Sequence, residues 1–401
     1  MSQIISVILL LLVISSGIYS LFALFCVIDF FRPEIKESKE IPYKPISILK
    51  PLSGGDPELF ENIQSFCKQE YPAYEVLMGV TDPMDLSIAT AEAVVKAHAG
   101  AAEGAEPGPF TRIIVSEKSL GANRKVSNLG GLAASAQYCL LAVSDSDMRV
   151  DSSYLKRIAG EYFSGENTGL VTSLYMIPNP LSPGAVFESL TIALDLIPSV
   201  LVARRLEGVT FGLGASMLFS KTALDAIGGF EAIADHLADD YQAGQRLWQK
   251  GYRIILSRYV LEDVPGAMSM AAHLKHQIRW ARTYRACRPK GFMGYGITYT
   301  LPISFMLFMQ QGPTVLSLSV LCLAASLRLC LAFVVCNKVI RKKGWLQWLI
   351  FLPLKDILGF GLWIWSLLGS TVLWRGSRYR ILKGGKIREI LSPGSVPRNK
   401  E

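Results

Sequence analysis

Residues 138–147 read Tyr-Cys-Leu-Leu-Ala-Val-Ser-Asp-Ser-Asp, an apolar stretch that ends in two carboxylates one residue apart. The apolar part predicts a buried β-strand over Tyr138–Val143, because short apolar runs bounded by polar residues are typical of strands inside a sheet. Asp145 and Asp147 then follow the carboxyl end of that strand, which is where open α/β sheets bind their ligands. Such a pair can hold Mg²⁺ or Mn²⁺, which usually also takes phosphate oxygens. Asp-x-Asp alone is a common pattern, so the strand before it carries the prediction.

The chain before this strand alternates between two patterns. Strands are predicted over Pro45–Leu52, Tyr74–Val80 and Arg112–Val115, and helices over Glu58–Gln69, Ala89–Ala97 and Val126–Ala136. This alternation favours an α/β fold with a doubly wound, mainly parallel sheet. The carboxyl ends of its strands would gather several polar motifs at one edge.

Two of these motifs lie upstream of the acid pair. Asp82 directly follows the strand at Tyr74–Val80, and Lys125 and Asn128 belong to a Gly/Asn turn that leads into a helix. A helix N-terminus with a nearby Lys is a ready anion site. Each motif also has an ordinary explanation: Asp82 before a proline can start a turn, and the second segment can be a capped helix with solvated charges.

Two more motifs lie downstream. Asp239 and Asp240 begin a predicted helix, where carboxylates also complement the helix dipole; a carboxylate there could equally deprotonate a substrate hydroxyl. Gln277, Arg279 and Trp280 lie in a basic helical segment just before an apolar region. An Arg and a Trp could clamp a leaving nucleotide, or they could anchor the segment at a membrane surface.

Long apolar runs flank the α/β region. Ile4–Ile28 is uncharged over 25 residues, long enough to cross a bilayer, and no cleavage site follows it, so we expect a retained anchor. Further spans are predicted at Gly294–Met309 and Thr314–Val335, and Trp345–Trp374 is apolar apart from Lys355-Asp356. Charges at that depth must be paired or face protein. The expected organisation is an anchor at 1–32, a catalytic domain at 33–290, transmembrane helices at 291–376 and a basic tail at 377–401.

The net charge of +8 is concentrated near the end of the chain. From residue 341 onward there are 12 Lys or Arg against 3 Asp or Glu. Next to a membrane this pattern suits anionic lipid headgroups better than nucleic acid, although a merely solvated tail would look the same. The seven Cys form no Cys-x-x-Cys pair, which fits a reducing, cytoplasmic setting for the α/β domain. The number of C-terminal spans, and hence the side on which the tail lies, stays open.

Taken together, the motifs resemble those of the ceramide glucosyltransferase family, and most closely its bacterial branch, which includes the hopanoid-biosynthesis-associated glycosyltransferases. Three separated Asp motifs precede a Gln-x-Arg-Trp segment, in the family's order, and the resemblance extends to GANRKVSNL (121–129), ADHLADDY (234–241) and WRGSRYRILKGG (374–385). The resemblance implies a nucleotide-sugar glycosyltransferase (GT-A) fold and a multi-pass protein of the bacterial inner membrane. It also implies an inverting, metal-dependent transfer of glucose or N-acetylglucosamine from a UDP-sugar to a lipid hydroxyl.

By position, the resemblance also implies roles for individual residues. Asp240, preceded by Asp239, would be the general base, and Asp147, with Asp145, would bind Mg²⁺ or Mn²⁺. The nucleotide-sugar would contact the remaining candidates, which are Asp82, Lys125, Asn128, Asp145, Gln277, Arg279 and Trp280. One departure concerns the substrates: animal members carry a His before a Pro after the second Asp motif, and residues 193–198 contain no His. The acceptor is therefore left as a ceramide- or hopanoid-type lipid.

Two other functions fit parts of this pattern. A processive polysaccharide synthase would use the same acidic motifs, but it needs more transmembrane segments than this chain offers. An inactive scaffold that binds a sugar nucleotide at the membrane would not need Asp240.

Overall fold

The computed structural model describes residues 2–33, 43–99 and 109–390. Its central element is an eight-stranded sheet of order β3-β2-β1-β4-β7-β6-β8-β5. The strands are β1 (Ile46–Pro51), β2 (Tyr74–Val80), β3 (Phe110–Val115), β4 (Leu140–Val143), β5 (Met148–Arg149), β6 (Thr168–Met176), β7 (Met217–Ser220) and β8 (Arg253–Asp263). The first four strands pair in parallel, as do β6 and β8, whereas β7 and β5 run antiparallel to their neighbours. The predicted mainly parallel α/β sheet is confirmed.

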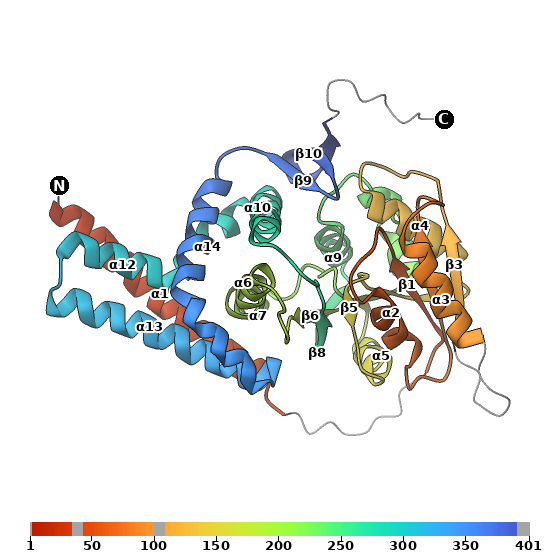
Figure 1. Cartoon of the computed structure of the whole chain (residues 1–401), viewed down its shortest axis with the longest axis horizontal. Coiled ribbons are helices and arrows are strands. Elements are labelled where there is room, and N and C mark those ends of the chain that lie inside the picture. The colour runs from red at the N-terminus through yellow and green to blue at the C-terminus, as the bar shows by residue number, and fades with distance from the viewer. Residues whose placement is uncertain (1, 34–42, 100–108, 391–401) are drawn as a thin grey trace.

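Helices cover both faces of this sheet (Figure 1). The helices of this part are α2 (Leu59–Cys67), α3 (Ser87–Ala99), α4 (Arg124–Ser135), α5 (Tyr154–Ser164), α8 (Lys221–Ala226), the 3₁₀ turn η2 (Glu231–Ile233) and α9 (Asp239–Gln249). Neighbouring residues of β1 serve opposite faces: Ile48 packs with α2, α3 and α5, and Leu49 packs with α4, α8 and α9. Strands buried on both faces are continuously apolar, which is why their sequence showed no alternation.

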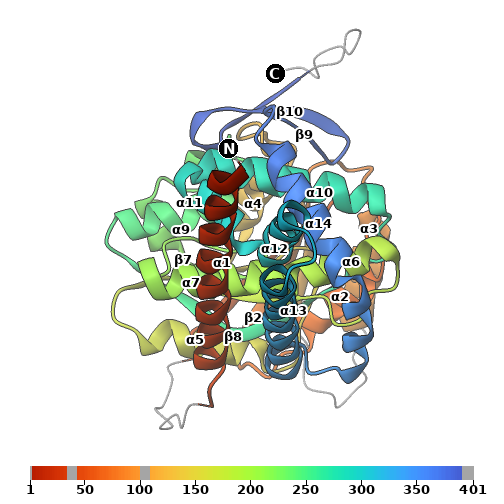
Figure 2. The same cartoon turned by 90° about the vertical axis from the view of Figure 1, so that its left-hand side faces the viewer.

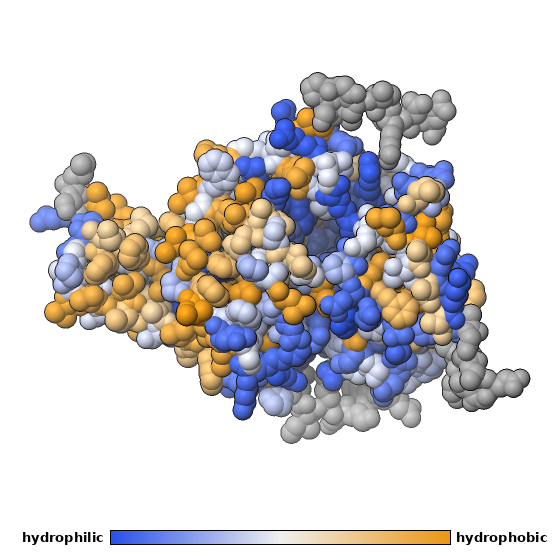
Figure 3. All heavy atoms as spheres, viewed as in Figure 1, coloured by the Kyte–Doolittle hydropathy of each residue, from blue (hydrophilic) through white to orange (hydrophobic). Residues whose placement is uncertain are grey.

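The apolar helices gather beside the sheet domain. They are α1 (Ser2–Phe30), α6 (Pro183–Thr191), η1 (Ile192–Leu196), α7 (Ile197–Glu207), α11 (Pro289–Tyr295), η3 (Gly296–Thr298), α12 (Thr300–Gln311), α13 (Val315–Val335), η4 (Cys336–Ile340), η5 (Lys343–Phe351) and α14 (Leu352–Ser366). The basic helix α10 (Met270–Cys287) packs against α6 and α14. Figure 2 shows α1, α12 and α13 side by side, and Figure 3 shows hydrophobic residues over that end of the molecule.

Several of these helices are long and apolar enough to cross a membrane. Among the described residues four helices meet this test, at Gln3–Phe30, Pro183–Glu207, Val315–Ile340 and Lys343–Ser366, and a fifth span is possible if one bent pair is counted. The bent pair joins Pro289–Thr298 to Thr300–Gln311 at 61°, so the span expected at Gly294–Met309 is broken. Apolar helices at both ends of the chain are confirmed. Pro183–Glu207 is mostly buried within the protein and was not expected to be a candidate span.

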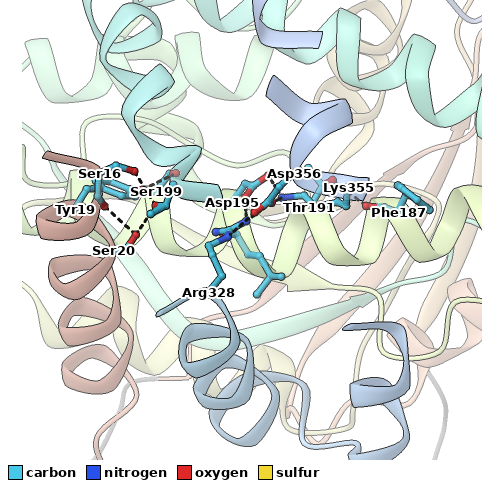
Figure 4. Close-up of polar contacts among 12 residues, drawn as sticks. Ser16, Tyr19, Ser20, Phe187, Thr191, Asp195, Ser199, Arg328, Lys355 and Asp356 are labelled. Carbon is cyan, nitrogen blue, oxygen red and sulfur yellow. Dashed lines mark hydrogen bonds and ion pairs between the residues drawn. The ribbon is translucent and has the colours of Figure 1, made fainter. Parts of the chain in front are cut away.

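Four charged side chains join three of the apolar helices to one another (Figure 4). Arg328 of α13 lies 3.0 Å from Asp195 of η1 and 2.6 Å from Asp356 of α14. Lys355 contacts the same two carboxylates. All four groups are buried, each cation contacts both anions, and the charges balance. The charges that interrupt the third apolar stretch are therefore paired inside the protein.

The expected basic tail is folded over part of its length. After α14, strands β9 (Thr371–Trp374), β10 (Ser377–Ile381) and β11 (Ile387–Glu389) form an antiparallel sheet of order β11-β10-β9, with the 3₁₀ turn η6 (Lys383–Gly385) between the last two. Tyr379 and Ile381 are buried there while Arg378 and Arg380 are exposed. The remainder of that expected segment, 391–401, lies outside the described residues.

Candidate functional site

A cavity of about 520 Å³ opens where the sheet domain meets the apolar helices. Its polar wall is formed by the segment after β4, the loop at 211–215, the start of α9 and the middle of α10. Most of the candidate residues line it, namely Lys125, Asp145, Asp147, Asp239, Asp240, Gln277, Arg279 and Trp280. Segments more than 130 residues apart in sequence thus meet at one site, and its volume is typical of a small-molecule pocket.

Asp145 and Asp147 lie just past the end of β4, as the sequence predicted, and have different partners. Lys125 Nζ is 2.5 Å from Asp145 Oδ1, and the buried Lys50 Nζ donates a hydrogen bond to the Asp145 carbonyl. Asp147 Oδ1 is buried without a hydrogen-bond partner among the described residues. Burial raises the pKa of Asp147 to about 6, Asp145 and Asp56 add to the rise, and Lys50 opposes it. The Oδ1 atom of Asp147 is therefore available to a bound cation.

Asp239 and Asp240 open α9 on the opposite wall. Asp240 Oδ2 accepts a hydrogen bond from the Gly214 amide at 2.8 Å, and Oδ1 accepts one from the Tyr241 amide. Asp239 Oδ2 lies 3.7 Å from Lys125 Nζ, so the lysine stands between the two acid motifs. Burial raises the pKa of Asp240 to about 6, with the Asp239 carboxylate adding to the rise and Lys125 opposing it. A carboxylate with this pKa is a competent base near neutral pH.

Small residues are required beside Asp240. A Cβ at Gly212 would lie 2.7 Å from the Asp240 carbonyl oxygen, and one at Gly244 would lie 2.2 Å from the Gly212 amide nitrogen. The loop at 211–215 therefore packs directly against α9. This contact positions the Gly214 amide that holds the Asp240 carboxylate.

Helix α10 brings the basic motif to the cavity. Gln277 Nε2 donates to the buried Glu188 of α6 at 3.0 Å, and His276, also bound to Glu188, contacts the Trp280 ring at a centroid distance of 4.5 Å. The Arg279 guanidinium has no hydrogen bond or ion pair among the described residues and lines the cavity. Burial lowers the pKa of Arg279, while Glu188 and other anionic groups oppose that shift. Arg279 is thus a cation available to an anionic ligand.

Two candidate residues lie outside the cavity lining. Asp82 is exposed, and its Oδ1 accepts a hydrogen bond from the Met84 amide at 2.9 Å, which is the turn contact that the following proline suggested. Asn128 is buried and its Nδ2 donates to the Gly79 carbonyl at 2.7 Å, so it joins α4 to the end of β2. Contacts of Asp82 and Asn128 with a nucleotide-sugar remain predictions.

Three polar residues that the sequence did not single out belong to the same region. Lys50 is fully buried in β1, and burial lowers its pKa to about 7, although Asp147 and Asp145 oppose the shift. Asp56 Oδ2 accepts a hydrogen bond from Ser146 between the two acids, at 2.5 Å. Asp263, at the end of β8, lines the cavity beside Asp147. Only Lys50 gave a signal in sequence, as a cation inside an apolar strand.

The acid cluster fits a hard divalent cation. Asp147 Oδ1 and Asp263 Oδ1 are both buried without a hydrogen-bond partner among the described residues. Burial raises the pKa of Asp263 well above its usual range, with the Asp147 charge adding to the rise. Within the described ranges, no three His, Cys, Asp or Glu side chains are grouped so as to enclose an ion. A site with few protein ligands suits Mg²⁺ or Mn²⁺, which keep waters and take substrate phosphate oxygens.

The far end of the cavity is built by the apolar helices. Tyr295 and Tyr299, Leu358 and Leu362, and Trp363 line it together with Asp195 and Lys355 of the charged network. One cavity therefore extends from the carboxylates of the sheet domain to side chains of α14 and of the bent helix pair.

Comparison with known proteins agrees with this geometry. The mannosyltransferase PcManGT from Pyrobaculum calidifontis, solved in complex with GDP-Man and Mn²⁺, superposes with a TM-score of 0.54 over 90% of this chain and 98% of its own, at 15% identity. At that identity the likeness concerns the fold, and the GT-A type of fold is confirmed.

Relatives by sequence share most of the chain. Ceramide glucosyltransferase 3 of Caenorhabditis elegans is 25% identical over 361 residues, covering 88% of this chain and 76% of the relative. Ceramide glucosyltransferase 1 of the same organism is 24% identical over 358 residues, with 88% and 75% covered. The pattern that describes Glycosyl transferase family 21 matches residues 8–387, which include the sheet domain, the apolar helices and most of the C-terminal sheet. The chain belongs to glycosyl transferase family 21.

Proposed function

We propose that this glycosyltransferase moves glucose or N-acetylglucosamine from a UDP-sugar to the hydroxyl of a ceramide- or hopanoid-type membrane lipid, with inversion at the anomeric carbon. The observation that carries the proposal is the single cavity that contacts both the acid cluster and the apolar helices. The relatives named ceramide glucosyltransferase support a glycolipid product. The neighbour solved with GDP-Man and Mn²⁺ supports a nucleotide-sugar donor and a divalent cation.

The donor's diphosphate would lie between the acid pair and two cations of the cavity, Lys125 and Arg279. Lys125, held by Asp145 at 2.5 Å, and Arg279 are placed to contact its oxygens. Asp147, with Asp145 beside it, would hold Mg²⁺ or Mn²⁺, whose charge offsets the negative charge that develops on the leaving UDP. Asp82 and Asn128 would contact the donor's nucleoside and diphosphate side from the ends of β2 and α4.

The acceptor hydroxyl would approach from the apolar end of the cavity. Asp240 would take its proton on a carboxylate oxygen as the hydroxyl oxygen attacks the anomeric carbon and the bond from that carbon to the diphosphate breaks. Help of this kind contributes about 10²–10⁴-fold to the rate. Attack opposite the leaving group inverts the anomeric carbon. The base and the donor's diphosphate would be kept in place by neighbouring side chains. These are Asp239, which lies beside Lys125, and Gln277 and Trp280 of α10.

The proposed organisation follows from the same cavity. Residues 1–32 would anchor the chain, 33–290 would form a catalytic domain facing the cytoplasm of a bacterial inner membrane, and 291–376 would complete the membrane part. Arg378 and Arg380 lie where anionic headgroups could approach the exposed face of the C-terminal sheet. The side of the membrane on which the catalytic domain lies can be tested with a variant that keeps the exposed Cys139 and no other cysteine. We expect an impermeant maleimide to label this variant only after the inner membrane is opened.

A transfer assay tests the chemistry. Purified protein in lipid nanodiscs is supplied with radiolabelled UDP-glucose or UDP-N-acetylglucosamine, with Mn²⁺ or Mg²⁺, and with a ceramide or a hopanoid polyol. We expect label in a lipid that carries one sugar, and nuclear magnetic resonance of the product should show the inverted anomeric linkage. A ladder of longer products would instead indicate a polysaccharide synthase. UDP binding with no transfer to any hydroxyl lipid would indicate a scaffold.

A further inference from the structure

The C-terminal sheet is held between the segments that carry the catalytic motifs. Its small core of Val372, Tyr379, Ile381 and Ile387 includes Leu237, which lies just before Asp239-Asp240. The Ile387 amide donates to the Asp235 carbonyl at 2.7 Å, and the Leu237 amide donates to the Gly385 carbonyl at 3.1 Å. Both views show this sheet against α10 at the same end of the molecule (Figures 1 and 2).

The chain leading into the sheet is fixed by α10, the helix that carries Gln277, Arg279 and Trp280. Arg282 Nη2 donates to the Leu368 carbonyl at 2.9 Å, and Arg285 Nη1 donates to the Ser366 carbonyl at 2.6 Å. The sheet is thus attached both to the segment just before Asp239-Asp240 and to the basic helix α10. Its position depends on the same two elements that form the cavity.

The tip of the β9–β10 hairpin is a strained two-residue turn. Trp374 pairs with Ser377, so Arg375 and Gly376 form the turn, with φ of 46° and 81°. Two positive φ values are typical of a type I′ turn, whose first position favours Asn, Asp or Gly. An Arg there is strained, which makes its side chain a candidate for a functional role.

That side chain is directed to the cavity and to the loop after β1. Arg375 and Trp374 both line the cavity that holds Asp145, Asp147 and Asp240. Arg375 Nη1 also donates to the Ser53 carbonyl at 3.1 Å, in the Gly-rich segment that follows β1. The hairpin tip therefore forms part of the cavity wall and adds a cation to a cavity rich in carboxylates.

We propose that Arg375 is a donor-binding residue, whose guanidinium contacts the diphosphate of the nucleotide sugar and of the product nucleotide. This inference rests on the proposed function. Guanidinium groups match phosphate oxygens in geometry and bind them more strongly than neutral donors do. With five N–H donors, Arg375 can keep its bond to Ser53 and still contact the nucleotide. The C-terminal sheet is then a fixed cover over the donor, and the strain in its turn is offset when the nucleotide binds.

Nucleotide binding by the purified full chain in detergent, measured by calorimetry with UDP and Mn²⁺, tests this role. Loss of one charge-assisted contact in Arg375→Ala should raise the Kd for UDP about tenfold or more. Arg380→Ala is the matched control, because Arg380 is exposed on the same hairpin and does not line the cavity. Its Kd should stay within about twofold of the wild-type value, since Arg380 lies outside the lining of the cavity in which the nucleotide would bind.

Arg375→Gly separates binding from folding. Glycine suits the turn, so this variant should melt at the same or a higher temperature than the wild type while its Kd for UDP rises as in Arg375→Ala. The KM for the donor should rise in both variants, with the KM for the acceptor unchanged. A wild-type chain that does not bind UDP would contradict the proposed function itself. If the wild type binds UDP, two results would overturn this inference alone. One is a Kd for UDP in the Arg375 variants equal to that of the wild type, and the other is an equal rise of the Kd in Arg380→Ala.

Discussion

Two clusters of buried charge in this molecule differ in whether they are balanced. In the network between the helices, Arg328 and Lys355 each contact Asp195 and Asp356, so two cations meet two anions. In the cavity, five carboxylates outnumber three cations without a carboxylate partner outside it, and Arg288 is already paired with Glu207. The carboxylates are those of Asp145, Asp147, Asp239, Asp240 and Asp263, and the cations are Lys125, Arg279 and Arg375. A balanced buried cluster is structural, because each charge already has its partner. In an unbalanced cluster some charges have no partner and favour the binding of a ligand of opposite charge. The buried carboxylate oxygens of the cavity that have no hydrogen-bond partner among the described residues mark where such a ligand would bind.

The two clusters lie at opposite ends of one cavity. Asp195 and Lys355 line its apolar end, and the excess carboxylates line the other. The balanced network joins η1, α13 and α14 and so fixes the walls through which an apolar acceptor would enter. If this comparison is right, substitutions in the two clusters must have separable effects. Substitutions among the cavity carboxylates should remove catalysis and metal binding, and substitutions in the balanced network should lower stability.

The largest effect is expected for Asp240→Asn. The amide cannot accept the acceptor's proton, so transfer should fall about 10²–10⁴-fold while UDP binding stays close to wild type. Stability should rise, because the substitution removes a charge that burial disfavours. Initial rates, calorimetry with UDP and thermal unfolding check the three statements together. Asp225→Asn, which changes an exposed acid away from the cavity, is the control, and transfer surviving in Asp240→Asn would rule out this base.

Arg328→Met should act on stability instead. It leaves Asp195 and Asp356 to share Lys355, and removing one member of a buried ion network costs about 3–5 kcal/mol. Thermal unfolding in nanodiscs, with Lys338→Met as an exposed control on the neighbouring turn η4, measures the loss. The double variant Arg328→Met/Asp356→Leu retains the Lys355–Asp195 pair and restores charge balance. It should regain part of the lost stability, and a double variant less stable than Arg328→Met would contradict the balanced-network account.

Asp147→Asn should remove the response to a divalent cation. A ligand that binds the folded state at 100 times its Kd stabilises it by about 2.7 kcal/mol. Mn²⁺ should therefore raise the melting temperature of the wild type and of Asp225→Asn, and leave that of Asp147→Asn unchanged. The readout needs no substrate, so it is independent of transfer. An undiminished Mn²⁺ response in Asp147→Asn would move the metal away from the acid pair.

The sequence was a good guide to the first half of the sheet and to the acid motifs. Tyr74–Val80 is β2 as predicted, and Asp145 and Asp147 follow β4. Both strands could be predicted because short apolar runs bounded by polar residues are typical of strands inside a sheet. Asp239 and Asp240 open α9 as expected. These features are local, and local patterns are what a single sequence carries.

What the sequence did not show depends on contacts between distant segments. The need for partners of Lys355 and Asp356 could be predicted from the cost of buried charge. Their identity could not, since Arg328 lies 28 positions from Asp356, and Asp195 lies 160 positions from Lys355. The folded part of the basic tail was missed for another reason. Counting charges there concealed the alternation of exposed Arg378 and Arg380 with buried Tyr379 and Ile381.

The smallest effect expected is a pH dependence that differs in sign between activity and stability. The pKa of Asp240 is raised by burial from 3.8 to about 6. As the proposed general base, Asp240 must be ionised to act. At saturating Mn²⁺, which keeps Asp147 ionised, the rate at pH 5.5 should therefore be about fourfold below its plateau. For stability the ionised form of Asp240 is the penalised one. Its cost is present above pH 6 and disappears as the pH falls toward 3.8, so the melting temperature should not fall over the same range. An acid-side loss of stability that parallels the loss of rate would mean that the cavity carboxylates, like those of the helix network, are already paired.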